Sequence, residues 1–345
     1  MKKDEMIYLT AAKGEKPETI PIVIEVQMVV CPGFKELQSK YGFEGICKNA
    51  ELSAQCTVMQ VNDLGVDAAI HMSDLLIPVE AMGVKVTHTF EGPKIENPVR
   101  TMADVEKLTV PDPQEGMKVW LEAMKIAKKE LTGKAPLIGW LGAPFSTASF
   151  VIEGGVPTTA PMPFHHMKTM MYSDPKTLHA LLAKLTEMYV HFIYSQVDAG
   201  ADVMMILDLR APAAFSSQDY HEFAFPYLKK IVSAIQSKGT PILFGSDGTT
   251  FLYAPIADLG IDFVALDWTI ELGDAIKRLG GRQVVQGNLE PYCLFASDDV
   301  IEKRVKEIIE AGKGAPSHIF SLGGWVIPNT PFEKVKFLVD LVHSL

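Results

Sequence analysis

Short apolar runs rich in β-branched residues alternate along the chain with longer amphipathic segments. The apolar runs predict eight strands, at Ile20–Val30, Ala68–Asp74, Leu137–Pro144, Val203–Asp208, Pro241–Asp247, Asp262–Trp268, Gln283–Leu289 and His318–Gly324. The amphipathic segments have helical period and predict eight helices, at Asn49–Leu64, Gly116–Leu131, Pro175–Ala199, Ser217–Lys238, Leu252–Leu259, Leu272–Leu279, Asp298–Ala311 and Thr330–Leu345. Strands that are almost wholly apolar are typical of a parallel sheet buried on both faces.

Eight alternations of strand and helix favour a closed (β/α)₈ TIM barrel, an α/β fold, over an open doubly wound sheet. No G-x-G-x-x-G motif follows the first strand, so a dinucleotide site is not supported. We expect residues 1–19 to form an N-terminal extension and residues 20–345 to form a single barrel domain. Two connections, Leu76–Thr101 and Phe145–Ser173, are longer than a barrel requires, and we expect them to shape a substrate pocket.

Composition limits the partners and the compartment. A net charge of −10 opposes binding to a phosphate backbone, so we expect no nucleic-acid partner. Residues 1–16 are mostly polar, and no apolar stretch reaches the about 18 residues of a membrane span. We therefore expect a cytoplasmic protein without a membrane contact. The four cysteines lack a C-x-x-C spacing, which predicts free thiols.

Carboxylates follow several of the predicted strands, and in a barrel the active site lies at the carboxyl ends of the strands. Together in a partly buried mouth, such groups would raise one another's pKa, bind a cation or a metal, or accept hydrogen bonds from substrate N–H groups. We expect at least two of them to pair with Arg210 or a lysine, or to cap a helix. The set is Asp74, Asp208, Asp247, Asp267 and Glu290, with Asn288 beside the last.

Strand alternation places Asp74 and Met72 on one side of the second strand and His71 on the other. We therefore expect His71 to be a hydrogen-bonded residue of the barrel wall, with a metal ligand as the less favoured interpretation. Asp247 is flanked by small residues, which allow a ligand to approach the backbone closely but are equally typical of a helix N-cap with a tight turn.

Several stretches resemble the uroporphyrinogen decarboxylase family, in the same order and at the same spacing. These are Gly65–Ile70 with Ser73–Leu76, Gly142–Phe145, Val151–Gly155, Met170–Pro175, Ala265–Thr269 and Gln286–Leu289. The resemblance implies a barrel with a deep cleft, often a homodimer, and it marks Asp74 as the carboxylate that holds pyrrole N–H groups. The uncharged helical stretch Phe192–Val197 is a further argument for a dimer.

The chain departs from the decarboxylase where the resemblance places its chemistry. Glu25 and Val29 stand where the family has arginines that grip substrate carboxylates. Phe150 replaces a tyrosine, and Gly324 replaces a histidine. A porphyrinogen with up to eight carboxylates would then face an uncompensated acidic cleft.

The same superfamily contains methyltransferases that exchange methyl groups with a corrinoid on a partner protein. The thiol-methylating members bind zinc through a His-x-Cys at the fifth strand and a late cysteine. Here Phe244, Ser246 and Gly324 occupy those positions, so that zinc site is absent as well.

These departures favour a corrinoid-linked methyltransferase component that acts on a small methylated substrate and docks a cobalamin protein. One alternative is a uroporphyrinogen decarboxylase that anchors its substrate through groups such as Arg210 and Arg100 and needs no cofactor. Another is a non-catalytic tetrapyrrole or corrinoid binder. The predicted catalytic residues are Asp74 and Asp247. Zinc held by Cys31, His71 and Asp247 is one interpretation, and a metal-free site is the other. The predicted substrate-binding residues are Glu25, Gln27, Met72, Phe145, Phe150, Asp208, Asn288 and Trp325.

Overall fold

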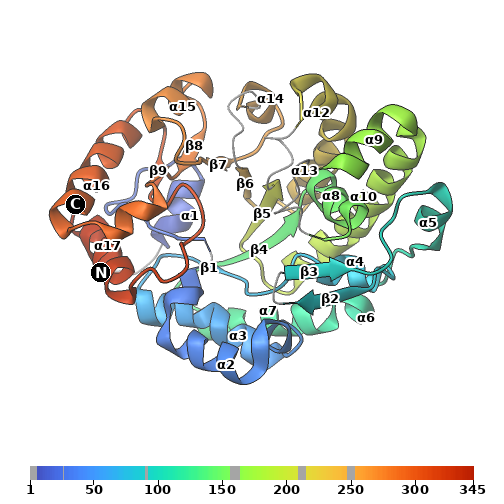
Figure 1. The fold of residues 1–345 in the computed structure, drawn as a ribbon. Coiled ribbons are helices and arrows are strands. Elements are labelled where there is room, and N and C mark those ends of the chain that lie inside the picture. The colour runs from blue at the N-terminus through green and yellow to red at the C-terminus, as the bar shows by residue number, and fades with distance from the viewer. Residues whose placement is uncertain (1–5, 26, 90–91, 156–163, 209–214, 247–252) are drawn as a thin grey trace.

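Seven parallel strands form one curved sheet with helices around its outside (Figure 1). The computed structural model describes residues 6–25, 27–89, 92–155, 164–208, 215–246 and 253–345. Each strand pairs in parallel with the next, from β1 to β4 and then in chain order to β9. This confirms the predicted TIM-barrel-like α/β fold. The strands are β1 Ala69–Ile70, β4 Leu137–Gly142, β5 Val203–Asp208, β6 Ile242–Ser246, β7 Phe263–Ala265, β8 Val284–Gln286 and β9 His318–Ile319.

The segment predicted as the first strand closes the ring with very few residues. Ile22 bridges Phe320 in parallel, and the Val23 N–H donates to the Phe320 carbonyl at 3.1 Å. On the other side, the Asp67 N–H donates to the Ile22 carbonyl at 2.9 Å. The prediction of a strand reaching Val30 is wrong, because residues 27–30 form a 3₁₀ helix, η1 (Gln27–Val30), and Pro32 opens a helix at its first position, where a missing N–H costs nothing.

Most of the predicted helices are present on the outside of the ring, with shifted ends. The prediction of one helix over 217–238 is wrong. The chain kinks at Ala224, because Pro226 lacks the N–H that a continuous helix needs. The helices are α2 Pro32–Cys47, α3 Ala50–Met59 with a π turn η2 over Gln60–Leu64, α7 Lys118–Leu131, α10 Pro175–Asp198, α12 Ser217–Phe223, α13 Phe225–Ser237, α14 Tyr253–Ala257, α15 Leu272–Arg278, η3 Pro291–Phe295, α16 Asp298–Gly312 and α17 Phe332–Ser344.

Both long connections contain regular structure, where the sequence predicted loops. The first carries helix α4 (Ile77–Ala81) and a hairpin of β2 (Val86–Thr89) and β3 (Gly92–Ile95), and helices α5 (Met102–Lys107) and α6 (Pro113–Gly116) follow it. The second carries α8 Pro144–Glu153 and α9 His165–Ser173. The two connections are tied together, because the Ile95 N–H donates to the Gly154 carbonyl at 2.9 Å and Arg100 Nε donates to the Ile152 carbonyl at 3.0 Å.

The N-terminal helix α1 (Ile7–Ala12) packs into the barrel. Tyr8 is fully buried, and its hydroxyl donates to Gln286 Oε1 at 3.1 Å. Its ring packs edge-on against Phe263 of β7. The uncharged stretch of α10, taken above as an argument for a dimer, is also occupied internally, since Phe192 is fully buried and packs against Trp120. None of the helices in the described part of the chain combines the length and apolarity needed to cross a membrane.

Candidate functional site

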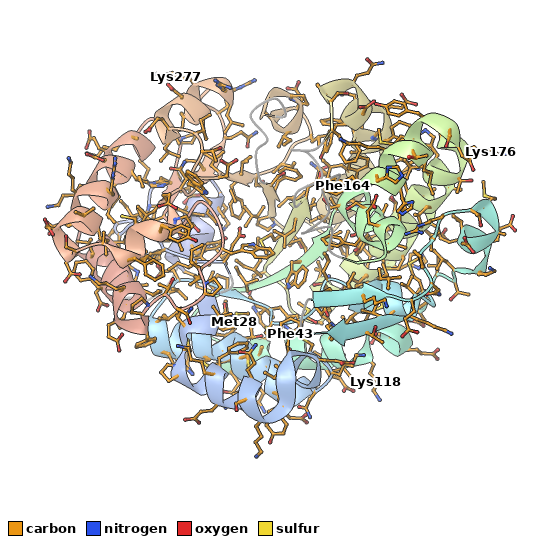
Figure 2. All side chains as sticks on the ribbon, in the orientation of Figure 1. Met28, Phe43, Lys118, Phe164, Lys176 and Lys277 are labelled. Carbon is orange, nitrogen blue, oxygen red and sulfur yellow. The ribbon has the colours of Figure 1, made fainter. Side chains whose placement is uncertain are left out.

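A cavity of about 330 Å³ opens beside the carboxyl ends of β1, β4 and β5. Both long connections contribute to its wall, through Pro93 of the hairpin and Phe150 of α8, which agrees with their predicted role in shaping a pocket. Met28 and Phe43, which also line it, are labelled in Figure 2. The lining residues are Glu25, Met28, Phe43, Ile70, His71, Met72, Ser73, Asp74, Leu75, Leu76, Pro93, Trp140, Phe150, Met205, Leu207 and Trp325.

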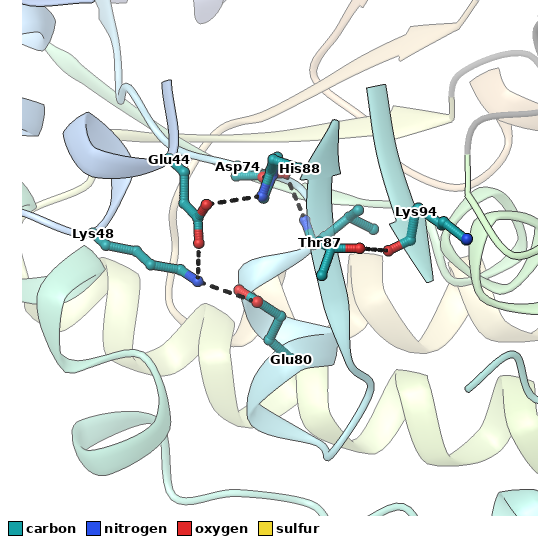
Figure 3. Close-up of polar contacts among 8 residues, drawn as sticks. Glu44, Lys48, Asp74, Glu80, Thr87, His88 and Lys94 are labelled. Carbon is teal, nitrogen blue, oxygen red and sulfur yellow. Dashed lines mark hydrogen bonds and ion pairs between the residues drawn. The ribbon is translucent and has the colours of Figure 1, made fainter. Parts of the chain in front are cut away.

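Asp74 lines this cavity and is held in place by two hydrogen bonds. Its Oδ1 accepts the Leu76 N–H at 3.0 Å, and its Oδ2 lies 2.7 Å from His88 Nε2 (Figure 3). Because a carboxylate oxygen only accepts, His88 Nε2 carries the proton in this bond. The side chain of Asp74 keeps 13% of its surface exposed, so a ligand can reach it. The structure therefore supplies a carboxylate of fixed orientation at the cavity wall.

A series of polar and charged side chains extends from Asp74 to the protein surface. His88 Nδ1 lies 3.6 Å from Glu44 Oε2 on α2, and Lys48 Nζ lies 2.8 Å from Glu44 Oε1 and 3.2 Å from Glu80 Oε1 (Figure 3). The bond from Lys48 holds the pKa of Glu44 below its ordinary value. His88 and Glu44 were missed from the sequence because no local pattern indicates that the hairpin folds back against α2. Through His88 and Glu44, helix α2, the hairpin and the segment that follows β1 come into contact at Asp74.

His71 also lines the cavity, next to Asp74. Its backbone is fixed, because the His71 N–H donates to the Ile138 carbonyl at 3.0 Å and Trp140 Nε1 donates to the His71 carbonyl at 2.7 Å. Its ring is buried, and burial lowers the pKa of the imidazole to about 3, so the ring is neutral. Within the described structure neither ring nitrogen has a hydrogen-bond partner. We predicted that His71 is a hydrogen-bonded residue of the barrel wall, and for its side chain that prediction is wrong.

Asp208 lies behind the cavity, outside its lining. Its carboxylate accepts a hydrogen bond from Ser146 Oγ at 2.5 Å and another from the Tyr220 hydroxyl. Burial raises the pKa of Asp208 to about 6, although both hydrogen bonds favour the charged form. Phe145 packs edge-on against Phe215 and Tyr220 in the same region. Asp208 and Phe145 were predicted to bind substrate, but both belong to the packed interior of the barrel and neither lines the cavity.

Asn288 and Asp267 fix the backbone at the ends of β7 and β8. Asn288 Nδ2 donates to the Asp267 carbonyl at 2.9 Å and to the Ile270 carbonyl at 2.7 Å. The Asp267 carboxylate accepts the Thr269 N–H at 2.8 Å. Asp267 thus caps the turn that follows β7, and not the next helix, α15, which begins at Leu272. Asn288, like Asp208, lies outside the lining of the cavity.

Six of the predicted site residues meet at the cavity. The side chain of Gln27 and the whole of Asp247 and Arg210 lie outside the described residues. Glu25 also borders a smaller hollow with Gly245 and Gly323, so it lies between the two spaces. The six are Glu25, His71, Met72, Asp74, Phe150 and Trp325.

The described donors do not fit the predicted zinc site. Cys31 is fully buried among apolar residues beside the barrel and does not line the cavity, and burial raises the pKa of its thiol to about 12. A thiol must lose its proton to bind zinc. No group of three or more His, Cys, Asp or Glu side chains among the described residues is arranged to hold a metal ion. We therefore assign no step to a metal.

The chain matches the family model described as Uroporphyrinogen decarboxylase (URO-D) over residues 3–345. Curated uroporphyrinogen decarboxylases from Trichlorobacter lovleyi and Geobacter metallireducens are 40% and 38% identical to it, each over 98% of both chains. A methyltransferase from Methanosarcina mazei superposes with a TM-score of 0.80 at 23% identity, over 98% of this chain and 97% of that one. This structural likeness shows a common fold.

Proposed function

Because the chain belongs to the uroporphyrinogen decarboxylase family and is therefore an enzyme of that superfamily, we propose that its cavity serves one reaction of the superfamily. That reaction is methyl transfer between a small, largely uncharged substrate and a corrinoid carried by a partner protein. The observation that carries it is the set of charged side chains in the described part of the cavity lining. Its described lining contains the carboxylates Glu25 and Asp74 and no lysine or arginine.

This charge opposes a polycarboxylate. Two like unit charges 4 Å apart repel by about 4 kcal/mol at an effective dielectric constant of about 20. Arg100, one of the alternative anchors, is outside the lining and donates from Nε to the Ile152 carbonyl at 3.0 Å and from Nη2 to the Glu153 carbonyl at 3.4 Å. Its hydrogen bonds hold the end of α8. A substrate with few or no negative charges therefore suits the cavity better.

The side chains in the cavity divide into two groups by chemistry. Met72, Phe150 and Trp325 provide apolar surface for the body of a substrate, and Trp325 is 48% exposed, at the edge of the cavity. Asp74, oriented by His88, accepts a hydrogen bond from a substrate N–H or O–H. The corrinoid, when its carrier docks over the mouth, supplies the cobalt that accepts or donates the methyl group. The barrel thus binds and orients the small molecule and keeps water from it.

Decarboxylation of uroporphyrinogen is the second candidate, and a specific observation favours it. The relatives reported above are 38–40% identical over 98% of both chains and are uroporphyrinogen decarboxylases. Sequence similarity taken alone supports this reaction better than methyl transfer. It would require cationic groups from outside the described lining, such as Arg210.

One pair of assays separates the two candidates. The purified protein is incubated with methylcobalamin or cob(I)alamin and a panel of methoxy aromatics, methylamines and thiols, and the cobalamin spectrum is followed. In parallel, uroporphyrinogen is supplied and the products are separated by chromatography. We expect spectral change with at least one member of the panel and no coproporphyrinogen. Coproporphyrinogen formation without any methyl transfer would establish the second candidate.

A charge variant tests the electrostatic argument directly. Glu25→Gln removes one negative charge from the cavity, and we expect uroporphyrin to bind several-fold more tightly to it than to the wild type. Glu271→Gln is the matched control, because Glu271 is exposed, precedes α15 and does not line the cavity. Equal affinities of the wild type and both variants would contradict the argument.

A further inference from the structure

His88 connects a carboxylate in the cavity with a carboxylate at the protein surface. Its Nε2 lies 2.7 Å from Asp74 Oδ2, and its Nδ1 lies 3.6 Å from Glu44 Oε2 (Figure 3). Asp74 lines the cavity, whereas 47% of the Glu44 side chain is exposed. The imidazole therefore stands between a group that a ligand can contact and a group that solvent can protonate.

The Nδ1 atom of His88 is closed to water. It is buried and has no hydrogen-bond partner among the described residues. Such an atom has lost its hydration without compensation, so a partner is expected for it. The Glu44 carboxylate faces it, and a shift of about 0.5 Å in this exposed side chain brings the two atoms within hydrogen-bond distance. In the described structure Glu44 is thus the route by which a proton reaches Nδ1.

Lys48 determines which oxygen of Glu44 faces the imidazole. Lys48 Nζ donates to Glu44 Oε1 at 2.8 Å, which leaves Oε2 for His88. The same ammonium lies 3.2 Å from Glu80 Oε1, so two carboxylates hold it in place. The bond from Lys48 also lowers the pKa of Glu44, so a proton that reaches Glu44 is passed on and not kept. The nearby Cys47 thiol stays protonated, because burial raises its pKa.

Both candidate reactions use a proton at the substrate. Loss of a methyl group to the corrinoid leaves an electron pair on the substrate atom that carried the methyl group, and loss of carbon dioxide leaves an electron pair on carbon. In each case the electron pair takes up a proton. When a substrate and a docked carrier cover the mouth, a route through the protein wall keeps the proton supply open. Imidazole suits such a route, because one ring nitrogen can take up a proton while the other gives one up.

We propose that Glu44 and His88 supply Asp74 with protons from solvent while the cavity is covered. A proton passes from the Glu44 carboxyl group to Nδ1 of His88, the proton on Nε2 passes to Asp74, and Asp74 passes it to the electron pair on the substrate. After the product leaves, Nδ1 returns its proton to Glu44, and water in the open cavity protonates Nε2. One proton from solvent is therefore consumed in each turnover. The inference rests on the proposed function only in placing a proton-consuming reaction in this cavity, and decarboxylation meets that condition too.

His88→Gln separates proton supply from the orientation of Asp74. The glutamine amide can still donate a hydrogen bond to Asp74, but it cannot pass a proton on. In whichever of the two activity assays shows turnover, we expect kcat to fall about tenfold or more and KM to change less than about twofold. The control is His343→Gln, because His343 Nε2 lies 2.8 Å from Asp67 Oδ2 in a similar pair outside the cavity. A wild-type kcat in His88→Gln would overturn the inference.

Variants of Glu44 test the surface end of the route. Glu44→Gln should lower kcat about tenfold and increase the solvent isotope effect on kcat, since proton supply becomes limiting. Glu44→Ala leaves space beside the imidazole, so its lowered kcat should recover as acetate is added at constant pH and ionic strength. The control is Glu302→Gln, because Glu302 is 46% exposed and pairs with Lys306 on α16 as Glu44 pairs with Lys48. A lowered kcat that acetate does not restore in Glu44→Ala would indicate a structural role and overturn the inference.

Nuclear magnetic resonance of the ¹⁵N-labelled imidazole rings provides a readout that does not need turnover. The His88 signals are identified by their loss in His88→Gln. We expect the Nδ1 signal to shift in Glu44→Gln, the Nε2 signal to shift in Asp74→Asn, and neither to shift in Glu302→Gln. An unchanged Nδ1 signal in Glu44→Gln would overturn the inference whether or not either reaction occurs. Both shifts without turnover in either assay would support the contacts of the route and reject the proposed function.

Discussion

Replacing Asp208 with asparagine should change how the stability of the barrel depends on pH. The Asp208 carboxylate is fully buried, and burial raises its pKa from 3.8 to about 6. Between these two values the folded protein binds the proton more tightly than the unfolded chain. Protonation therefore stabilises the fold, and this contribution is complete below pH 3.8 and is lost as the pH rises through about 6.

The size of the effect follows from the interval between the two pKa values. At about 1.36 kcal/mol per pH unit, the interval from 3.8 to about 6 corresponds to about 3 kcal/mol. The asparagine side chain has nearly the same shape as the aspartate that it replaces, and it does not titrate. The free energy of unfolding of the wild type minus that of Asp208→Asn should therefore fall by about 2 to 3 kcal/mol between about pH 4 and about pH 7.

Urea unfolding followed by circular dichroism measures this difference at several pH values. The other carboxylates titrate in both proteins, so subtraction removes most of their contribution. Ser146→Ala is a useful second variant, because the Ser146 bond favours the charged form of Asp208 and its loss should move the pH transition upward. A wild-type-minus-variant difference that is constant with pH, or that increases as the pH rises, would refute the reasoning.

Three further substitutions follow from the packing and from the site. Gly323→Ala would place Cβ 2.3 Å from the Trp268 backbone nitrogen, so we expect a loss of about 1–3 kcal/mol in chemical unfolding. Gly273→Ala is its control, because its Cβ meets open space within α15, and it should gain about 0.5–1 kcal/mol. Equal effects of the two would contradict the close approach. His88→Leu removes the hydrogen bond that orients Asp74, and it should lower kcat/KM about tenfold or more in whichever of the two activity assays shows turnover. An unchanged kcat/KM would contradict a positioning role for His88.

The sequence predicted the parts of this fold that depend on local pattern. The inner strands β4 and β5 lie within the predicted ranges, because a continuous apolar run flanked by helical periods is sufficient to indicate a buried parallel strand. The hairpin of β2 and β3 was not predictable in this way. Its contact with Asp74 depends on how an insertion folds back over the mouth, which neither the strand period nor the helical period describes.

His71 shows why the side-chain directions at the site were harder to predict. The prediction that His71 and Asp74 face opposite sides rests on a strand that continues from residue 68 to residue 74. In the structure β1 ends at Ile70, and side chains of α3 hold the next residues, since Thr57 Oγ1 accepts the Met72 N–H at 2.9 Å and Ser53 Oγ donates to the Met72 carbonyl. The alternation of side chains between the two faces of a strand therefore ends at Ile70. His71 and Asp74 can therefore line the same cavity, although residue alternation along a strand would have separated them.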